Sequence, residues 1–197
     1  MVLIVATACS SVFAAKDKFT ITAAFYGATT NWSDYTDAAR KATYVQDGTL
    51  IIPMRETLNN IEILDGLHLL AVCMTFRDRP FSTLLGEWGT PFPKEITPKL
   101  IEEEYEKAKE RPVIKTKHFE ILGAYYGAYT RMIEVTHKLP QFVTEDGKLD
   151  ASSQSKPYEY NMWTPNNDRT LVVFYKDKDG LKYKTALESD EANLTLP

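Results

Sequence analysis

The sequence predicts an all-β protein made of two tandem homologous β-sandwich-like modules, each with one short helix, joined by a helical linker. The first observation is an internal repeat, in which residues 19–36 align with residues 119–136 and eight of the eighteen aligned positions are identical. The second is composition, since aromatic residues make up 12% of the 197-residue chain and fall in short β-branched runs. The third is a repeated order of strand, turn and short-helix signals.

Four segments follow along the chain. Residues 1–15 are predicted to be a signal peptide cleaved near Ala14, because a short apolar run ends in small residues. Two alternatives stay open for this segment: a lipoprotein-type site at residues 6–9, and a strand donated to a neighbouring copy. The remaining boundaries are predicted as follows: β module 1 at residues 16–90, a Pro-rich and helical linker at 91–116, and β module 2 at 117–197.

Each module begins with an alternating strand, at residues 19–26 or 119–125, that ends at Gly27 or Gly127. An acidic-x-Thr segment follows, and its threonines, Thr36 and Thr136, are predicted to be the N-caps of short helices. In the second copy Pro140 falls near the fourth helical position, so that helix is expected to be short.

Turns and hairpins complete each module. Asp-Gly turns are predicted at residues 47–48 and 146–147, and the variable segments 54–66 and 150–168 are interpreted as loops. The apolar runs 67–76 and 171–175 are expected to open hairpins that a last strand closes. Continuing the repeat register after a one-residue gap pairs residues 76–78 with residues 175–177.

The linker contains the strongest helix signal in the chain. Thr97 is the expected N-cap and Pro98 the first helical residue. Ile101, Tyr105 and Ala108 fall on one stripe of this helix. Glu103 and Lys107 form an expected i,i+4 ion pair. The simpler interpretation is a spacer that packs one face against a module, and the alternative is a helix that binds a partner.

The two cysteines have different surroundings. Cys9 lies in the predicted leader, so a cleaved chain would carry Cys73 alone. The repeat register places Val172 opposite Cys73 in the second copy. A thiol whose counterpart is Val is expected to be a buried, unreactive core residue.

The pattern of the second copy resembles a known family. It contains Tyr-Tyr-Gly at residues 125–127, Glu-Val-Thr at 134–136, Asp-Gly-Lys-Leu at 146–149, an apolar strand at 170–175 and Leu-Thr-Leu-Pro at 194–197. These motifs look like the domain of unknown function at the carboxy terminus of mitochondrial DnaJ-like co-chaperones. The resemblance covers residues 117–197 well and 17–90 more loosely. It implies no catalytic residues, and co-chaperone activity is not implied because no His-Pro-Asp tripeptide occurs.

Composition and motifs exclude several classes of function. The net charge is −4, with 23 basic and 27 acidic residues spread along the chain, so no basic stripe favours nucleic acid or anionic membrane. The apolar leader is shorter than the roughly 20 residues of a membrane-spanning helix. The sequence has no phosphate-binding loop or hydrolase motif, and its three histidines lack zinc-ligand spacing. No catalytic, cofactor-binding or metal-binding residue, and no cofactor, is therefore predicted.

Three observations leave other chemistry to consider. The repeated acidic pairs Asp34/Glu134 and Asp47/Asp146 have the residue type of glycosidase carboxylates, but each precedes a helix or lies in a turn. The tryptophans Trp32, Trp88 and Trp163 are the residues expected in a sugar-binding platform. Asn31 and Asn193 begin sequons and are glycosylation acceptors if the chain enters a eukaryotic secretory pathway.

These features predict a non-enzymatic, exported protein with a structural or adhesive role. Its expected partner is a protein, including a second copy of itself, because the motifs are structural and an export signal is predicted. The alternative is a carbohydrate-binding module, which requires exposed aromatic side chains in a groove.

Overall fold

The computed structural model describes residues 20–46, 49–53, 67–77, 79–88, 94–128, 131–160, 169–191 and 193–197. The first half of the molecule, residues 20–109, contains β1 (Thr20–Ala28), β2 (Asn31–Asp34), α1 (Thr36–Ala42), β3 (Tyr44–Gln46), β4 (Thr49–Ile52), β5 (Leu67–Phe76), β6 (Arg79–Trp88), β7 (Lys94–Ile96) and α3 (Pro98–Lys109). The predicted leader, the Asp47-Gly48 turn and the loop at 54–66 lie outside the described residues.

The second half, residues 119–197, follows a connecting segment at residues 110–118. It contains β8 (Phe119–Ala128), β9 (Arg131–Glu134), β10 (Leu149–Ala151), β11 (Thr170–Asp177), β12 (Gly180–Leu187) and β13 (Leu194–Leu196). In the described residues of this half, short 3₁₀ helices accompany the strands: η1 (Thr136–Phe142), η2 (Lys156–Tyr158) and η4 (Glu188–Asp190).

Strand pairing has the same order in both halves. A four-stranded antiparallel sheet runs β2-β1-β5-β6 in the first half and β9-β8-β11-β12 in the second. A smaller sheet accompanies each one, β3-β4-β7 in the first half and β10-β13 in the second. In each half the last strand pairs antiparallel with an earlier strand, β7 with β4 and β13 with β10. The all-β class is confirmed.

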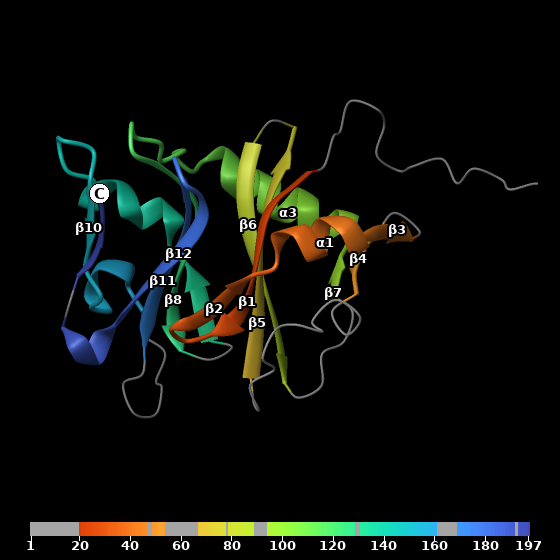
Figure 1. Ribbon diagram of the computed structural model, residues 1–197, viewed down its shortest axis with the longest axis horizontal. Helices are drawn as coiled ribbons and strands as arrows, with labels where there is room; N and C mark the ends of the chain where they lie inside the picture. The colour runs from red at the N-terminus through yellow and green to blue at the C-terminus, as the bar shows by residue number, and fades with distance from the viewer. Residues whose placement is uncertain are drawn as a thin grey trace, which may run out of the picture.

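The two four-stranded sheets lie face to face at the centre of the molecule (Figure 1). Alternate residues of the strands fill the space between them, as the two-residue period of a strand requires. We call this set the inner cluster; its buried members are Ala23, Phe25, Trp32, Leu69, Ala71, Cys73, Tyr125, Val172 and Phe174. The extended sheet-on-sheet contact therefore joins the two halves, a relationship that the sequence does not predict.

The outer face of each large sheet is covered by elements of its own half. In the first half α1, α3 and the small sheet lie on that side, as Figure 1 shows. The core there includes Tyr26, Met74 and Phe76 from the sheet, with Ile96 and Ile101 packed over them. In the second half the outer core joins the large sheet to η1, η2 and the small sheet.

The long helix predicted after Thr97 is confirmed with its predicted cap. Thr97 Oγ1 accepts a hydrogen bond from Leu100 N at 3.2 Å, and Pro98 is the first helical residue. Ile101 and Ala108 are buried, and Tyr105 stands edge-on to Phe76 with ring centroids 5.4 Å apart. This helix packs against the first sheet.

The expected ion pair on that helix is wrong. Lys107 Nζ contacts Glu104 Oε1 at 2.6 Å instead of Glu103, and Glu103 lies 3.7 Å from Lys99. Both i,i+3 and i,i+4 spacings bring side chains together on a helix, so the sequence alone does not decide between them.

The roles assigned to the acidic-x-Thr segments also need correction. The N-caps are Tyr35 and Val135, and the threonines occupy the first helical position. Thr36 Oγ1 accepts a hydrogen bond from Ala24 N at 3.0 Å, where β1 no longer has a ladder partner on β2. Asp34 accepts instead from Thr36 N at 2.8 Å.

The second half repeats these contacts. Thr136 Oγ1 accepts from Ala124 N at 2.8 Å, and Glu134 Oε1 accepts from Thr136 N at 2.9 Å. The short helix is of the 3₁₀ type and includes Pro140, whose missing N–H a short helix accommodates.

The predicted counterpart of Cys73 is wrong by two residues. Cys73 pairs with Ala23 on β1, whereas Val172 pairs with Tyr125 on β8. Position 123, which corresponds to Ala23, pairs with Phe174. A shift of two residues preserves the face of a strand, so the expected burial of Cys73 is confirmed, with 1% of its surface exposed.

Candidate functional site

A small cavity marks the place where the chain passes from the first half to the second. Its volume is about 30 Å³, enough for a water molecule or two and far below the several hundred Å³ of a typical ligand pocket. The lining residues come from β6, the connecting segment, β8, the end of β9 and the start of η1, and they include Ser82, Arg111, Ile114, Glu134 and Thr136. We call this place the junction.

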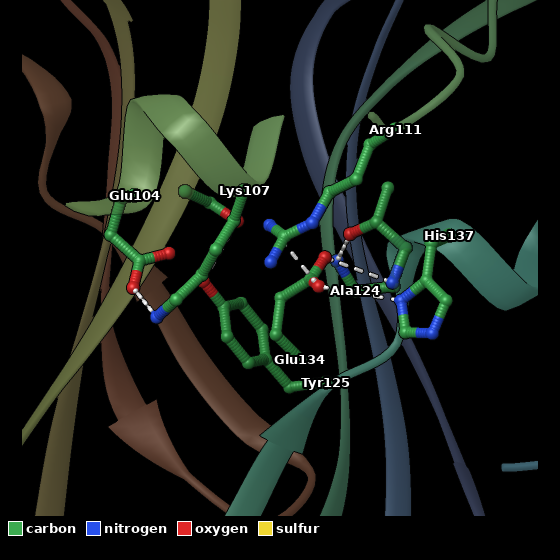
Figure 2. A network of polar contacts seen from close by, with 9 residues as sticks. Glu104, Lys107, Arg111, Ala124, Tyr125, Glu134 and His137 are labelled. Atoms are coloured by element: carbon green, nitrogen blue, oxygen red, sulfur yellow. Dashed lines mark hydrogen bonds and ion pairs between the residues drawn. The ribbon is translucent and has the colours of Figure 1, made fainter. Parts of the chain in front are cut away.

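Glu134 is the central polar residue of the junction. One carboxylate oxygen accepts the hydrogen bond from Thr136 N. The other oxygen lies 3.2 Å from Arg111 Nη1 and 3.6 Å from His137 Nδ1. Figure 2 shows Arg111 and His137 approaching Glu134 from opposite sides. The exposed side-chain fractions are 19% for Arg111 and 15% for Glu134, so the pair is largely shielded from water.

A second polar contact crosses the interface beside the junction. Tyr125 on β8 donates a hydrogen bond from its hydroxyl to Ser82 Oγ on β6 at 2.7 Å. Burial raises the pKa of the Tyr125 hydroxyl well above its ordinary value, so the phenol stays protonated. Ser82 is itself 3% exposed.

These polar groups connect different parts of the fold. Glu134 ties the connecting segment to β9 and η1, and the Tyr125–Ser82 hydrogen bond ties the two sheets. The hydroxyl of Ser82 accepts a hydrogen bond from a phenol that keeps its own proton, whereas a nucleophilic hydroxyl needs a neighbouring base that takes its proton. The described residues contain no group of three or more His, Cys, Asp or Glu that could hold a metal ion.

The repeated carboxylates lie at separate structural positions. Asp34 and Glu134 each accept a backbone N–H at the start of a helix. Asp146 accepts from Thr144 Oγ1 at 2.6 Å and pairs with Lys148 at 2.8 Å in an exposed turn. Asp47 lies outside the described residues.

A polar cluster that sequence reasoning missed lies on the outer side of the second half. Arg169 and Glu188 form an ion pair at the ends of β11 and β12, with side chains 20% and 12% exposed. The ring of Tyr160 lies 6.0 Å from the Arg169 guanidinium and packs edge-on against Tyr126. In the first half, residues 68 and 87, His and Glu, pair across β5 and β6 at the positions that correspond to Arg169 and Glu188. A comparison of the two halves of the sequence could therefore have indicated this pair.

The predicted sugar-binding tryptophans and the two sequons lie in different environments. Trp32 is 3% exposed and packs edge-on against Phe174, which makes it part of the inner cluster. Trp163 and the side chain of Trp88 lie outside the described structure. Asn31 and Asn193 are exposed, and Asn193 Nδ2 donates to Asp150 Oδ1 at 3.0 Å.

Edge strand β3 carries exposed apolar side chains. Tyr44 is 50% exposed and Val45 is 55% exposed, and all three residues of this strand face solvent. Among the strands of the described residues, β3 pairs with β4 on one side and lies at the end of the sheet order, which makes it an edge strand. The other large apolar side chain with such exposure in the described part of the chain is Val113, in the connecting segment.

Comparison with protein family models, with curated proteins and with solved structures found no match. Within the described ranges, no helix has both the length and the apolar character needed to cross a membrane.

Proposed function

We propose that this chain is a non-enzymatic, exported protein with a structural or adhesive role, acting through protein–protein contacts that include contacts with its own copies. The observation that carries this proposal is the exposed apolar edge of β3. A strand edge offers unpaired N–H and C=O groups to another strand, and natural proteins usually protect such edges with charge or proline. Tyr44 and Val45 provide neither.

The junction supports the same proposal. Its cavity is too small for a ligand of drug size, and its polar groups are engaged in contacts that hold the chain. The burial of Trp32 counts against the carbohydrate-binding alternative at that residue.

The proposal includes a tandem duplication. Three matched features support it: the common strand order, the matched contacts of Asp34/Glu134, and the matched contacts of Thr36/Thr136. The two modules are proposed to be homologous copies of one β unit with α3 as linker. The family resemblance of residues 117–197 stays a prediction.

Sedimentation velocity tests the self-association. We expect the wild-type chain to associate weakly and in proportion to its concentration, because a strand edge of three residues buries little surface. Val45→Lys should remove the rapidly reversible part of this association, which passes through the β3 edge, by placing a charge on that edge. Val113→Lys is the matched control, since it introduces the same charge at a similarly exposed valine away from β3. Monomers at all concentrations would refute self-association through β3.

Mass spectrometry of the chain exported by its native host tests the localisation. We expect a mature chain that begins near Ala15, because the small-residue pattern predicts cleavage after Ala14. An intact Met1 in large assemblies would instead favour the donated-strand alternative.

A further inference from the structure

The interface between the two halves is a buried apolar surface. Its centre is aromatic: Phe25 of β1 stacks on Phe174 of β11 with ring centroids 4.6 Å apart. Trp32 of β2 meets the same Phe174 ring edge-on at 5.1 Å. Each half therefore presents an apolar face that needs the opposite face of the other half to exclude water.

The covalent connection between the halves is short and local. Helix α3 packs on the first sheet through Ile101 and Ala108, so the first half extends to residue 109. The second half begins by residue 114, because Ile121 N donates to Ile114 O at 2.9 Å and Thr116 N donates to Phe119 O at 2.8 Å. The chain therefore crosses between the halves within residues 110–113.

An ion pair and a backbone hydrogen bond, from Arg111 N to Ala108 O at 3.1 Å, hold the chain at this crossing. Arg111 is held by Glu134 of the second half at 3.2 Å, directly beside the cavity. Val113 two residues later is half exposed, and Pro112 lacks a backbone N–H. Loss of the Arg111–Glu134 contact would remove one of the interactions that hold residues 110–113 in the path in which both halves of one chain pack together.

We infer that two copies of this chain exchange halves, the first half of each copy packing on the second half of the other. In the exchanged dimer each sheet packs on the same kind of sheet face as in the single chain. The contacts of the inner cluster are therefore kept, and residues 110–113 alone change path. Exchange of identical elements is a low-cost route to a dimer for this reason. The inference rests on the proposed self-association and gives it a mechanism other than the β3 edge.

Mixed dimers test the inference directly. Heavy-isotope and light copies of the full chain, both carrying Cys9→Ser, are incubated together and analysed by native mass spectrometry. Thiol labelling of Cys73 is followed in the same samples, because this residue lies in the inner cluster and becomes accessible when the halves separate. We expect mixed dimers to form at the rate at which Cys73 is labelled.

The variant Arg111→Ala should accelerate both the formation of mixed dimers and the labelling of Cys73 about tenfold, since it removes a shielded ion pair at the crossing. Glu134→Gln should do the same while keeping an acceptor for Thr136 N, and it serves if Arg111→Ala fails to fold. Lys115→Ala is the matched control, because its pair with Glu120 at 3.3 Å lies wholly on the second-half side of the crossing.

The outcomes separate the two proposals. Mixed dimers that form while Cys73 stays protected, or that disappear in Val45→Lys, would overturn exchange of halves and leave association through β3 standing. An absence of mixed dimers in both Glu134→Gln and the wild-type chain would also overturn it. Equal acceleration by Lys115→Ala would show that the crossing is not specific and would contradict the inference as well.

Discussion

Tyr125 and Ser82 form a buried hydrogen bond of 2.7 Å that joins the sheets of the two halves. In the matched strand order of the two halves, Tyr125 corresponds to Phe25. Ser82 corresponds to Tyr183, because Ser82 pairs with Cys73 and Tyr183 pairs with Phe174, the residue at the position of Cys73 in the second half. Phe25 and Tyr183 also touch, with ring centroids 6.3 Å apart and an edge-on geometry. At equivalent positions of the interface, one side therefore has a hydrogen bond, Tyr125–Ser82, and the other has an aromatic contact, Phe25–Tyr183.

Tyr125→Phe should destabilise the protein by about 1–2 kcal/mol, because it leaves the Ser82 hydroxyl buried without its donor. Adding Ser82→Ala should recover most of this loss, since removing both partners also removes the unsatisfied group. Urea unfolding of the two single variants and the double variant measures the coupling. Additive losses would mean that the hydrogen bond contributes nothing.

Gly27→Ala should cost more than about 3 kcal/mol, because a Cβ there would lie 2.1 Å from Asn31 O, a backbone atom that cannot move aside. Gly127→Ala meets the same obstacle at Arg131 O, 2.2 Å away. Gly180→Ala is the informative comparison: its φ of 123° disfavours a side chain, but no atom lies within 4 Å. It should cost about 1–2 kcal/mol in the same denaturation assay. Equal costs at Gly27 and Gly180 would contradict the close-approach explanation.

The sequence predicted those elements whose signals are local. Alternating strands, the Thr97–Pro98 start of α3 and the burial of Cys73 follow from residue type and period, and the structure confirms them. The register after the loops was wrong by two residues. A gap in a loop can be placed in several ways, and a shift by two leaves every side chain on its predicted face.

The relationship between the halves could not be predicted in the same way. Phe25 and Phe174 are both apolar residues of alternating strands, and alternation shows that a face is buried without showing what buries it. The junction was missed because Arg111, Glu134 and Ser82 come from distant segments. Glu134 was singled out as a repeated acid, and its bond to Thr136 N explains the repeat, but its contact with Arg111 depends on the fold.

Asp34→Ala should destabilise the protein by about 1 kcal/mol, because Thr36 N loses its acceptor at the start of α1. Asp34→Asn keeps an oxygen in the same place and should be nearly neutral. Glu134→Ala should cost about 2–3 kcal/mol, since it also leaves Arg111 without its largely buried partner. Thermal or urea unfolding measures the three variants, and equal losses at Asp34 and Glu134 would show that the Arg111 contact is energetically silent.

The protein should lose stability steeply above about pH 10. Burial raises the pKa of Tyr35 and of the Cys73 thiol to about 12, and it raises the pKa of Tyr125 well above its ordinary value. These groups ionise at lower pH in the unfolded chain than in the folded one, so the folded state binds more protons in this range. Their contribution is fully present below the unfolded pKa and is lost as pH rises toward the folded one. Each fully buried tyrosine should lower the free energy of unfolding by up to about 1.4 kcal/mol per pH unit above 10.

Urea unfolding at a series of pH values from neutral to alkaline, with phenolate absorbance recorded in parallel, checks this dependence. In Tyr125→Phe the slope of stability against pH should be shallower by the contribution of one tyrosine. Tyr44→Phe, at a half-exposed position on β3, is the control and should keep the wild-type slope. If Tyr125 ionised reversibly near pH 10 without loss of folded protein, the interface around it would have to be open to water, and the packing of the two halves against each other would be wrong.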